Sequence, residues 1–144
     1  MNNALNLLGR LLLAALFLPA GLAKLSGFEG TVGYIESVGL PLPAVAAAAA
    51  LTLEILGSLA LLVGFQTRIV AAVLAVFTLV ASVFFHAFWA AAPEQAFVQQ
   101  LLFFKNVGVV GGLLVLVSSG AGAWSLDAKK PHNNFFSPSV LHLF

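Results

Sequence analysis

The sequence predicts an all-α membrane protein whose chain crosses the bilayer four times. Of its 144 residues, 61% are hydrophobic and 8% are charged, whereas an average soluble domain has about 25% charged residues. A soluble domain of this length could not cover its surface with so few polar side chains, but lipid removes that requirement. Four apolar segments also each have about the 20 residues that a helix needs to cross a bilayer.

The residues between the four apolar segments are typical of turns. Pro41 and Pro43 suit the start of the second helix, because the first residues of a helix need no N–H partner. A short polar turn from Gly64 to Arg68 separates the second segment from the third, and Gly120 follows the fourth. We therefore expect a four-transmembrane-helix bundle with helices over residues 4–23, 43–64, 69–91 and 97–119.

Residues 26–40 are too polar to cross the bilayer and too apolar for a free loop. We expect a short interfacial segment here, between helices 1 and 2, as a short helix or a re-entrant hairpin. After residue 126 the composition changes, so we expect one transmembrane domain over residues 1–126. Residues 127–144 are expected to form a C-terminal tail in the cytoplasm, at the membrane surface or under the bundle.

The first helix could alternatively be a signal peptide, because residues 21–23 resemble a small-residue cleavage site. Its apolar stretch is long, however, and Lys24 follows it directly instead of a soluble domain. These features favour a retained helix.

The placement of lysine and arginine predicts the orientation. Four crossings put both termini on one side, and the side with more basic residues is normally cytoplasmic. We therefore expect a multi-pass protein with both termini cytoplasmic. The basic residues on the side of the termini are Arg10, Arg68, Lys129 and Lys130; the other side has Lys24 and Lys105, with Glu29, Glu36 and Glu94.

Each expected helix contains at least one ionisable residue: Arg10, Glu54, His86 and Lys105. A charge near the bilayer centre costs several kcal/mol and normally faces a partner inside the bundle. Glu54 is the deepest acid, and Arg10 and Lys105 lie within reach of it. This pattern has two interpretations: a structural ion pair between Arg10 and Glu54, or a polar pocket for a ligand or a proton in which Glu54, His86 and Lys105 are catalytic candidates.

His86 lies among phenylalanines in residues 84–89. It is either an interfacial histidine or a group that donates a hydrogen bond to a ligand carbonyl or exchanges a proton near neutral pH. If some of the nearby rings face inward, they form a slot for a flat ring. Lys24, Trp89 and Asn106 are further candidates for cofactor binding. The phenylalanines in question are Phe84, Phe85, Phe88, Phe103 and Phe104.

Other residue types exclude several function classes and predict packing. The chain has no cysteine, which excludes disulfides and thiol redox chemistry in this chain. A net charge of +1 without a basic tract gives no reason to expect nucleic acid binding. No metal, haem or flavin motif is present, and no histidine pair has metal-ligand spacing. Small residues that we expect at close helix contacts are Gly57, Ser58, Gly108, Gly111 and Gly112.

The order of these elements resembles the DoxX family of small four-helix membrane proteins. The matching elements are Arg10, residues 19–24, Glu54 with Gly57, residues 64–68, His86, Lys105-Asn106 and Gly111-Gly112. The resemblance covers roughly residues 5–125 and implies a bundle in the bacterial inner membrane. It further implies a link to quinone-coupled oxidoreductases.

Three functions are compatible with the sequence. The first is a quinone-linked oxidoreductase component with a polar pocket in the outer half of the bundle, which would receive electrons from a redox partner protein or a soluble reductant. The second is a small-solute carrier that uses a buried Glu54–Lys105 pair and works as a homo-oligomer. The third is a non-catalytic assembly or scaffold subunit in contact with lipid.

Overall fold

A computed structural model describes residues 2–129, and all regular secondary structure within this range is helical. Four helices are long and apolar enough to cross a membrane, counting α4 together with η1 as one span. This confirms the predicted all-α membrane fold. The elements are α1 (Asn3–Ser26), α2 (Phe28–Ser37), α3 (Pro43–Val63), α4 (Thr67–Phe85), η1 (Phe88–Ala90), α5 (Pro93–Ser119) and η2 (Asp127–Lys129).

Two helix boundaries differ from the sequence expectation, and one of the two alternatives for residues 26–40 is confirmed. The helix α4 ends at Phe85 rather than near residue 91, because His86 has a non-helical backbone (φ −128°, ψ 40°). The helix α5 begins at Pro93, four residues early, because proline fits the first helical position and Glu94 suits the positive N-terminal end. The expected interfacial segment is a 10-residue helix, α2, and not a hairpin.

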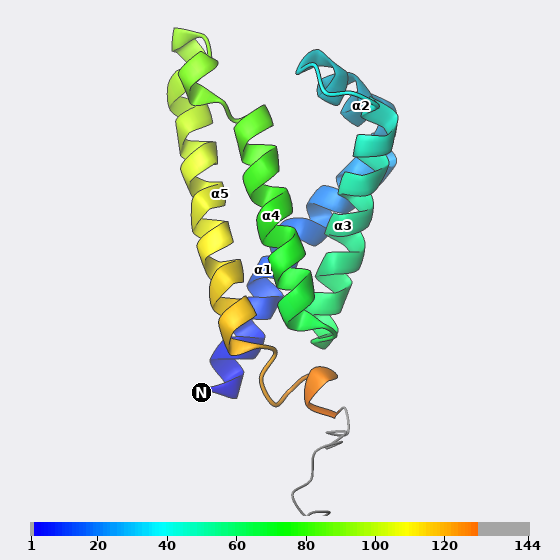
Figure 1. Ribbon diagram of the computed structural model, residues 1–144, viewed down its shortest axis with the longest axis vertical. Helices are drawn as coiled ribbons and strands as arrows, with labels where there is room; N and C mark the ends of the chain where they lie inside the picture. Colours follow the sequence, from blue (N-terminus) through cyan, green and yellow to red (C-terminus); the bar gives the residue numbers. More distant parts are fainter. Residues whose placement is uncertain (1, 130–144) are drawn as a thin grey trace, which may run out of the picture.

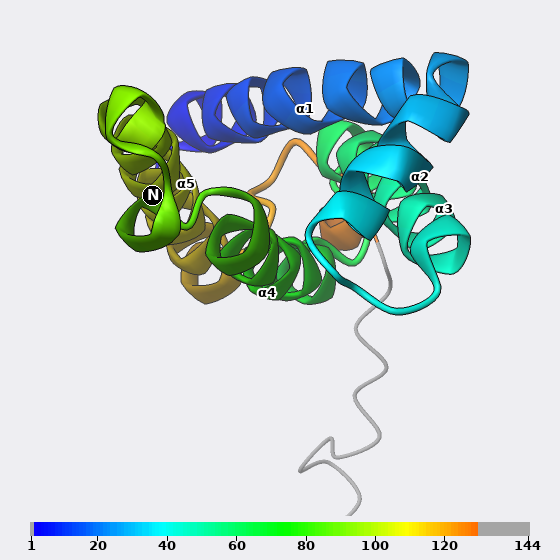
Figure 2. The ribbon, with the colours of Figure 1, turned by 90° about the horizontal axis from the view of Figure 1, so that it is seen from above.

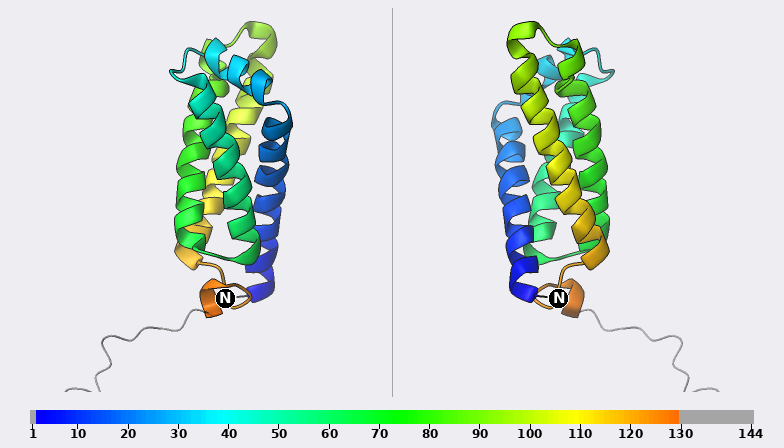
Figure 3. Two further views of the ribbon diagram at one scale, coloured as in Figure 1. Left: turned by 90° about the vertical axis from the view of Figure 1, so that its right-hand side faces the viewer. Right: turned by 90° about the vertical axis from the view of Figure 1, so that its left-hand side faces the viewer.

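The long helices form two antiparallel pairs, α1 with α3 and α4 with α5. Figure 1 shows the two pairs close together near the N-terminus and spread apart at the opposite end, where α2 lies beside α3. Seen from above, in Figure 2, the four long helices are arranged around a common axis, with α2 across the end of the bundle beside α3. Figure 3 shows the N-terminus and η2 at the same end of the bundle, as an even number of crossings requires. We call this the terminal end and the opposite end the open end.

The hydrophobic core lies mainly in the half of the bundle near the terminal end. Leu61 and Leu116 are within the last turn of α3 and α5, and Ala71 is in the second turn of α4. Many large apolar side chains point outward instead; Val76 is 64% exposed and Phe97 is 68% exposed. Such surfaces suit contact with lipid rather than water. The core residues are Ala14, Phe17, Leu61, Ala71, Leu74, Ala75, Leu113 and Leu116.

Arg10 ties three segments together at the terminal end. Its side chain is fully buried. Nη1 donates to the carbonyl oxygens of Leu61 (3.1 Å) and Leu62 (3.4 Å), and Nη2 donates to that of Trp124 (2.5 Å). The last carbonyls of a helix lack partners within it and carry partial negative charge. The guanidinium therefore donates hydrogen bonds to carbonyl oxygens in the last turn of α3 and connects α3 to the segment after α5.

Residues 120–129, which we call the terminal strap, close the same end. The carboxylate of Asp127 accepts hydrogen bonds from the backbone N–H groups of Gln66 (2.8 Å) and Thr67 (2.9 Å), at the start of α4. A negative charge at a helix N-terminus is stabilising. Residue 127, where the tail was expected to begin, is thus bonded to the bundle. Residues 130–144 of the expected tail lie outside the described part of the chain.

The glycines divide into two groups. A Cβ at Gly21 would lie 2.7 Å from Cγ1 of Ile55, so α1 and α3 approach closely there. A Cβ at Gly57 would lie 3.1 Å from the Leu74 side chain, as expected for a packing glycine. A Cβ at Gly108 or Gly111 would meet nothing within 4 Å. The expectation that these two bring helices together is therefore wrong within the described chain, because this face of α5 points outward.

Candidate functional site

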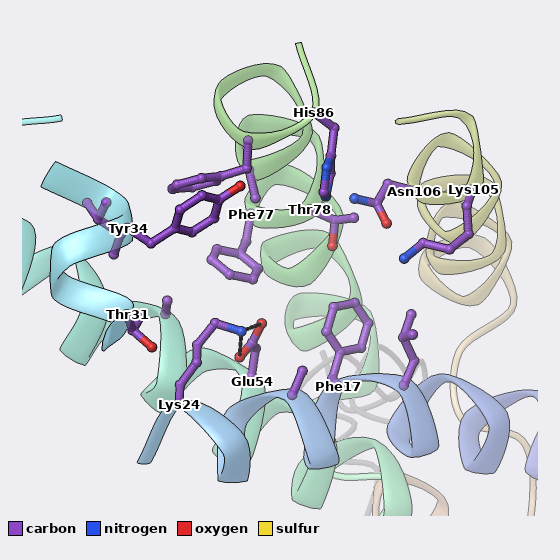
Figure 4. Close-up of a pocket in the computed structure, with 16 residues that line it drawn as sticks. Phe17, Lys24, Thr31, Tyr34, Glu54, Phe77, Thr78, His86, Lys105 and Asn106 are labelled. Carbon is purple, nitrogen blue, oxygen red and sulfur yellow. Dashed lines mark hydrogen bonds and ion pairs between the residues drawn. The ribbon is translucent and has the colours of Figure 1, made fainter. Parts of the chain in front are cut away.

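A cavity of about 310 Å³ opens between the two helix pairs on the side of the open end (Figure 4). Its size lies at the lower end of the range for small-molecule sites, about 300–1,000 Å³. All five α-helices contribute to its wall, which is mainly apolar with several polar groups. The lining residues are Leu16, Phe17, Ala20, Lys24, Thr31, Tyr34, Ile35, Ala50, Glu54, Phe77, Thr78, Ala81, Phe85, His86, Lys105 and Asn106.

An ion pair between Lys24 of α1 and Glu54 of α3 forms one side of the cavity. The ammonium Nζ lies 2.8 Å from Oε2 and donates a hydrogen bond of 2.9 Å to Oε1. The Glu54 side chain is 7% exposed and that of Lys24 is 29% exposed. Gly21, one turn before Lys24, lets α1 approach α3 closely enough for this contact.

The expected Arg10–Glu54 ion pair is not formed, and neither is a Glu54–Lys105 pair. Arg10 is occupied by backbone carbonyls at the terminal end. The Lys24–Glu54 pair was not predicted from the sequence. Helical side chains lean toward the helix N-terminus, however, and that direction carries the long side chain of Lys24 back into the bundle.

Lys105 and Asn106 of α5 both line the cavity, although they are adjacent in the helix. The side-chain nitrogen of Asn106 donates to Oγ of Ser82 (2.9 Å), which donates to the carbonyl of Thr78 (2.7 Å). Asn106 of α5 therefore bonds a side chain of the neighbouring helix α4. Figure 4 shows the ammonium of Lys105 pointing toward the cavity from the opposite side to the Lys24–Glu54 pair.

His86 lies directly after α4, at the rim of the cavity. Its Nδ1 is 2.9 Å from Oε1 of Gln99. An amide oxygen only accepts hydrogen bonds, so this contact is a hydrogen bond in the tautomer that has its proton on Nδ1. In the neutral ring Nε2 is then an acceptor. His86 can donate from Nε2 only when it is protonated, which sharpens the predicted role as a donor or a proton exchanger.

Most of the aromatic lining comes from residues other than those expected. Tyr34 and Phe85 pack with ring centroids 5.2 Å apart, and Phe17 and Phe77 complete the aromatic lining. Of the phenylalanines expected in a slot, Phe85 alone is in the lining. Trp89 is 59% exposed and lies outside it. It joins a separate aromatic cluster around η1 with Phe88, Phe103 and Phe104.

The contribution of α2 was missed at the sequence level. Thr31 and Tyr34, three residues apart, share one face of a helix and line the cavity. The sequence contains a pattern that could have predicted this face, because Glu29 and Glu36 lie on the opposite face of a helix with 100° per residue. The two glutamates mark the outward side of α2.

In residues 2–129, no three His, Asp or Glu side chains gather as metal ligands.

Comparison with known proteins gives consistent similarities. The model of the DoxX family matches residues 5–87, a range that includes Lys24, Glu54 and His86. The chain is 40% identical over 124 residues to inner membrane protein YqjF of Escherichia coli strain K12, which covers 84% of this chain and 88% of that protein.

Two further relatives were found. Inner membrane protein YphA of the same organism is 34% identical over 123 residues, covering 85% of this chain and 88% of that protein. The surfeit locus protein 4 homolog of Schizosaccharomyces pombe is 37% identical over 70 residues, covering 47% of this chain and 23% of that protein. No solved structure matches.

Proposed function

The chain belongs to the DoxX family of inner-membrane proteins, and we propose that it binds the head group of a membrane quinone as a component of a quinone-linked oxidoreductase. The observation that carries this proposal is the cavity between the helix pairs, in which hydrogen-bonding groups from α1, α3, α4 and α5 meet aromatic rings. A quinone has the matching features: a flat ring, two carbonyl acceptors at opposite edges and an apolar tail.

The polar groups lie on opposite sides of the cavity, which suits a ligand with two carbonyls. Lys24 and Glu54 are on one side, and Lys105 and Asn106 are on the other. A lysine or amide N–H on each side can donate to a ring carbonyl. Tyr34 and the phenylalanines can hold the ring through edge or offset contacts, which are favourable between aromatic systems.

Reduction of a quinone requires two electrons and two protons and yields a quinol with two hydroxyl groups. Glu54 and His86 are the cavity groups suited to exchange those protons with the ring oxygens. The chain has no cysteine, so its own thiols cannot supply the electrons. A redox partner protein or a soluble reductant supplies them in this proposal. If both termini are cytoplasmic, as the charge distribution predicts, the cavity lies in the outer half of the bundle.

The proposal is tested by calorimetric titration of the purified full-length protein in neutral detergent with a short-chain benzoquinone. We expect saturable binding that weakens at least about tenfold, 1.4 kcal/mol, in Glu54→Gln. Glu36→Gln, on the outward face of α2, is the matched control and should bind like the wild type. Absence of saturable binding, or equal affinity in the Glu54→Gln and Glu36→Gln proteins, would overturn the proposal.

A further inference from the structure

We propose that the cavity selects a ring that carries a negative charge on oxygen, and that Lys105 is the counter-ion that selects it. This inference rests on the proposed function and deepens it by naming the chemical class of the ligand. Three observations lead to it: the depth of Lys105 along α5, the count of charges around the cavity and the direction of the Lys105 side chain.

Lys105 lies near the middle of a membrane-spanning helix. It is the thirteenth of the 27 residues in α5, so it lies about 18 Å from the Pro93 end and about 21 Å from the Ser119 end at 1.5 Å per residue. The hydrocarbon core of a bilayer is about 30 Å thick. The four-carbon stem of lysine is much shorter than the distance to either membrane surface, so extension to the headgroups does not remove the charge from the apolar region.

No acidic side chain in residues 2–129 neutralises Lys105. All five acidic side chains of the sequence lie within the described residues, and Glu54 alone lines the cavity. Its carboxylate already contacts Lys24, and no salt bridge in residues 2–129 includes Lys105. With His86 neutral, the cavity has two ammonium groups and one carboxylate, a net charge of +1. The other acids are Glu29, Glu36, Glu94 and Asp127.

The groups around Lys105 in the cavity are otherwise neutral. The neutral side chains that line the cavity together with Lys105 include Leu16 and Phe17 from α1 and Thr78 and Ala81 from α4. A charge in such surroundings costs several kcal/mol, and a ligand of opposite charge removes that cost. The cavity should therefore bind an anion more tightly than a neutral molecule of the same shape.

The aromatic lining restricts which anion fits. Phe17, Tyr34, Phe77 and Phe85 suit a flat ring. A quinone with a hydroxyl on the ring loses its proton readily, because the resulting charge spreads over the ring and the carbonyl oxygens. Its negative oxygen would bind the ammonium of Lys105, and the remaining carbonyl would face Lys24. Hydroxyquinones in their deprotonated form are thus the ligand class that matches both shape and charge.

The test compares two ligands of nearly the same shape, 2-hydroxy-1,4-naphthoquinone and 1,4-naphthoquinone, at pH 7.5, where the first is an anion. Both are titrated calorimetrically into the full-length protein in neutral detergent. We expect the anion to bind at least about tenfold more tightly. Lys105→Met should abolish this preference by weakening the binding of the anion more than that of the neutral quinone, to which Asn106 can still donate. Lys105→Arg should keep the preference. The chain has no cysteine, so thiol adducts do not consume the quinones.

The outcomes separate this inference from the function on which it rests. Equal affinities for the two quinones in the wild type, or a preference that survives in Lys105→Met, would overturn the inference and leave quinone binding intact. Failure of both quinones to bind would overturn both proposals. Displacement of the hydroxyquinone by dihexanoylphosphatidylglycerol, but not by dihexanoylphosphatidylcholine, would contradict the ring assignment and identify a site for anionic lipid headgroups.

Discussion

The two ends of the bundle both contain polar side chains around a buried one, Arg10 at the terminal end and Glu54 toward the open end, but these side chains have different partners. At the terminal end, Arg10, Arg68 and Asp127 bond backbone groups at the ends of helices. At the open end, Lys24, Glu54 and Lys105 surround a cavity. A backbone group at a helix end needs a partner in any state of the protein. A side chain that faces a cavity keeps its bonding capacity for a ligand.

The comparison separates structural from functional polar residues in a membrane protein, where all ionisable residues initially invite a functional interpretation. The two classes differ in what the ionisable side chain contacts. A side chain that bonds backbone carbonyls has a structural role, whereas a side chain that lines a cavity has a binding role. Arg68 illustrates the first case, because its Nη1 donates to the carbonyls of Val117 (2.7 Å) and Ser118 (2.6 Å) at the end of α5. The predictions below test this division by measuring stability and ligand binding for the same variants.

Arg10→Met should give the largest loss of stability. The change removes a fully buried guanidinium and leaves carbonyl oxygens of α3 and the terminal strap without their donors. Because hydrogen bonds from charged groups contribute about 1.5–3 kcal/mol each, we expect a loss on the order of 3 kcal/mol. Unfolding of the protein in mixed micelles with increasing dodecyl sulfate measures it. A variant as stable as the wild type would contradict the structural role of Arg10.

Gly21→Ala should destabilise the contact between α1 and α3. The new Cβ would lie 2.7 Å from Ile55 Cγ1 and 3.1 Å from its backbone nitrogen, and overpacking of this kind costs about 1–3 kcal/mol. Gly111→Ala is the matched control, because its Cβ would meet nothing within 4 Å. The control should be neutral or slightly stabilising in the same unfolding assay. Equal effects of the two changes would show that the α1–α3 contact is looser than described.

Asp127→Asn should destabilise the protein by a smaller amount. The amide keeps one acceptor but loses the negative charge at the N-terminus of α4, which contributes about 0.3–1 kcal/mol. Because Asp127 is at the terminal end, quinone affinity should not change. Reduced quinone affinity in this variant would indicate that the strap influences the cavity and would weaken the division between the two ends.

Glu54→Gln should have the smallest effect on stability, less than about 1 kcal/mol, because the amide oxygen can still accept from the partly exposed Lys24. Quinone affinity should fall at least about tenfold, because the negative charge that holds the Lys24 ammonium at the cavity wall is lost. Unfolding and quinone titration on the same preparation measure both quantities. A large stability loss without any change in affinity would place Glu54 among the structural residues.

Much of the fold was predictable because a helix that crosses a membrane needs a long apolar segment, which is easily recognised in a sequence. The long apolar segments and the turn residues at Pro41, Pro43 and Gly64 located the spans within a few residues. The end of α4 was missed because apolar character continues past His86 while the backbone leaves the helix. Periodicity and hydropathy do not report such a change in dihedral angle.

Part of the cavity lining was predictable from the sequence, but the pairing of its charged residues was not. Glu54, His86, Lys105, Lys24 and Asn106 were all candidates, and all five line one cavity. The predicted partner of Glu54 was wrong because the position of a residue in a helix gives the depth of its Cα atom. The long side chain of a lysine can place its charge at a different depth along the helix axis. The partners of Arg10 were unpredictable for a different reason: backbone carbonyls at helix ends have no residue-specific signature in a sequence.

The most direct test of the division between the two ends is the quinone affinity of two variants, one from each end. Short-chain benzoquinone is titrated into Glu54→Gln and Asp127→Asn under the conditions used for the wild type. We predict at least about a tenfold loss of affinity in Glu54→Gln and wild-type affinity in Asp127→Asn. Equal affinities in the two variants, or a greater loss in Asp127→Asn, would contradict the assignment of binding to the open end.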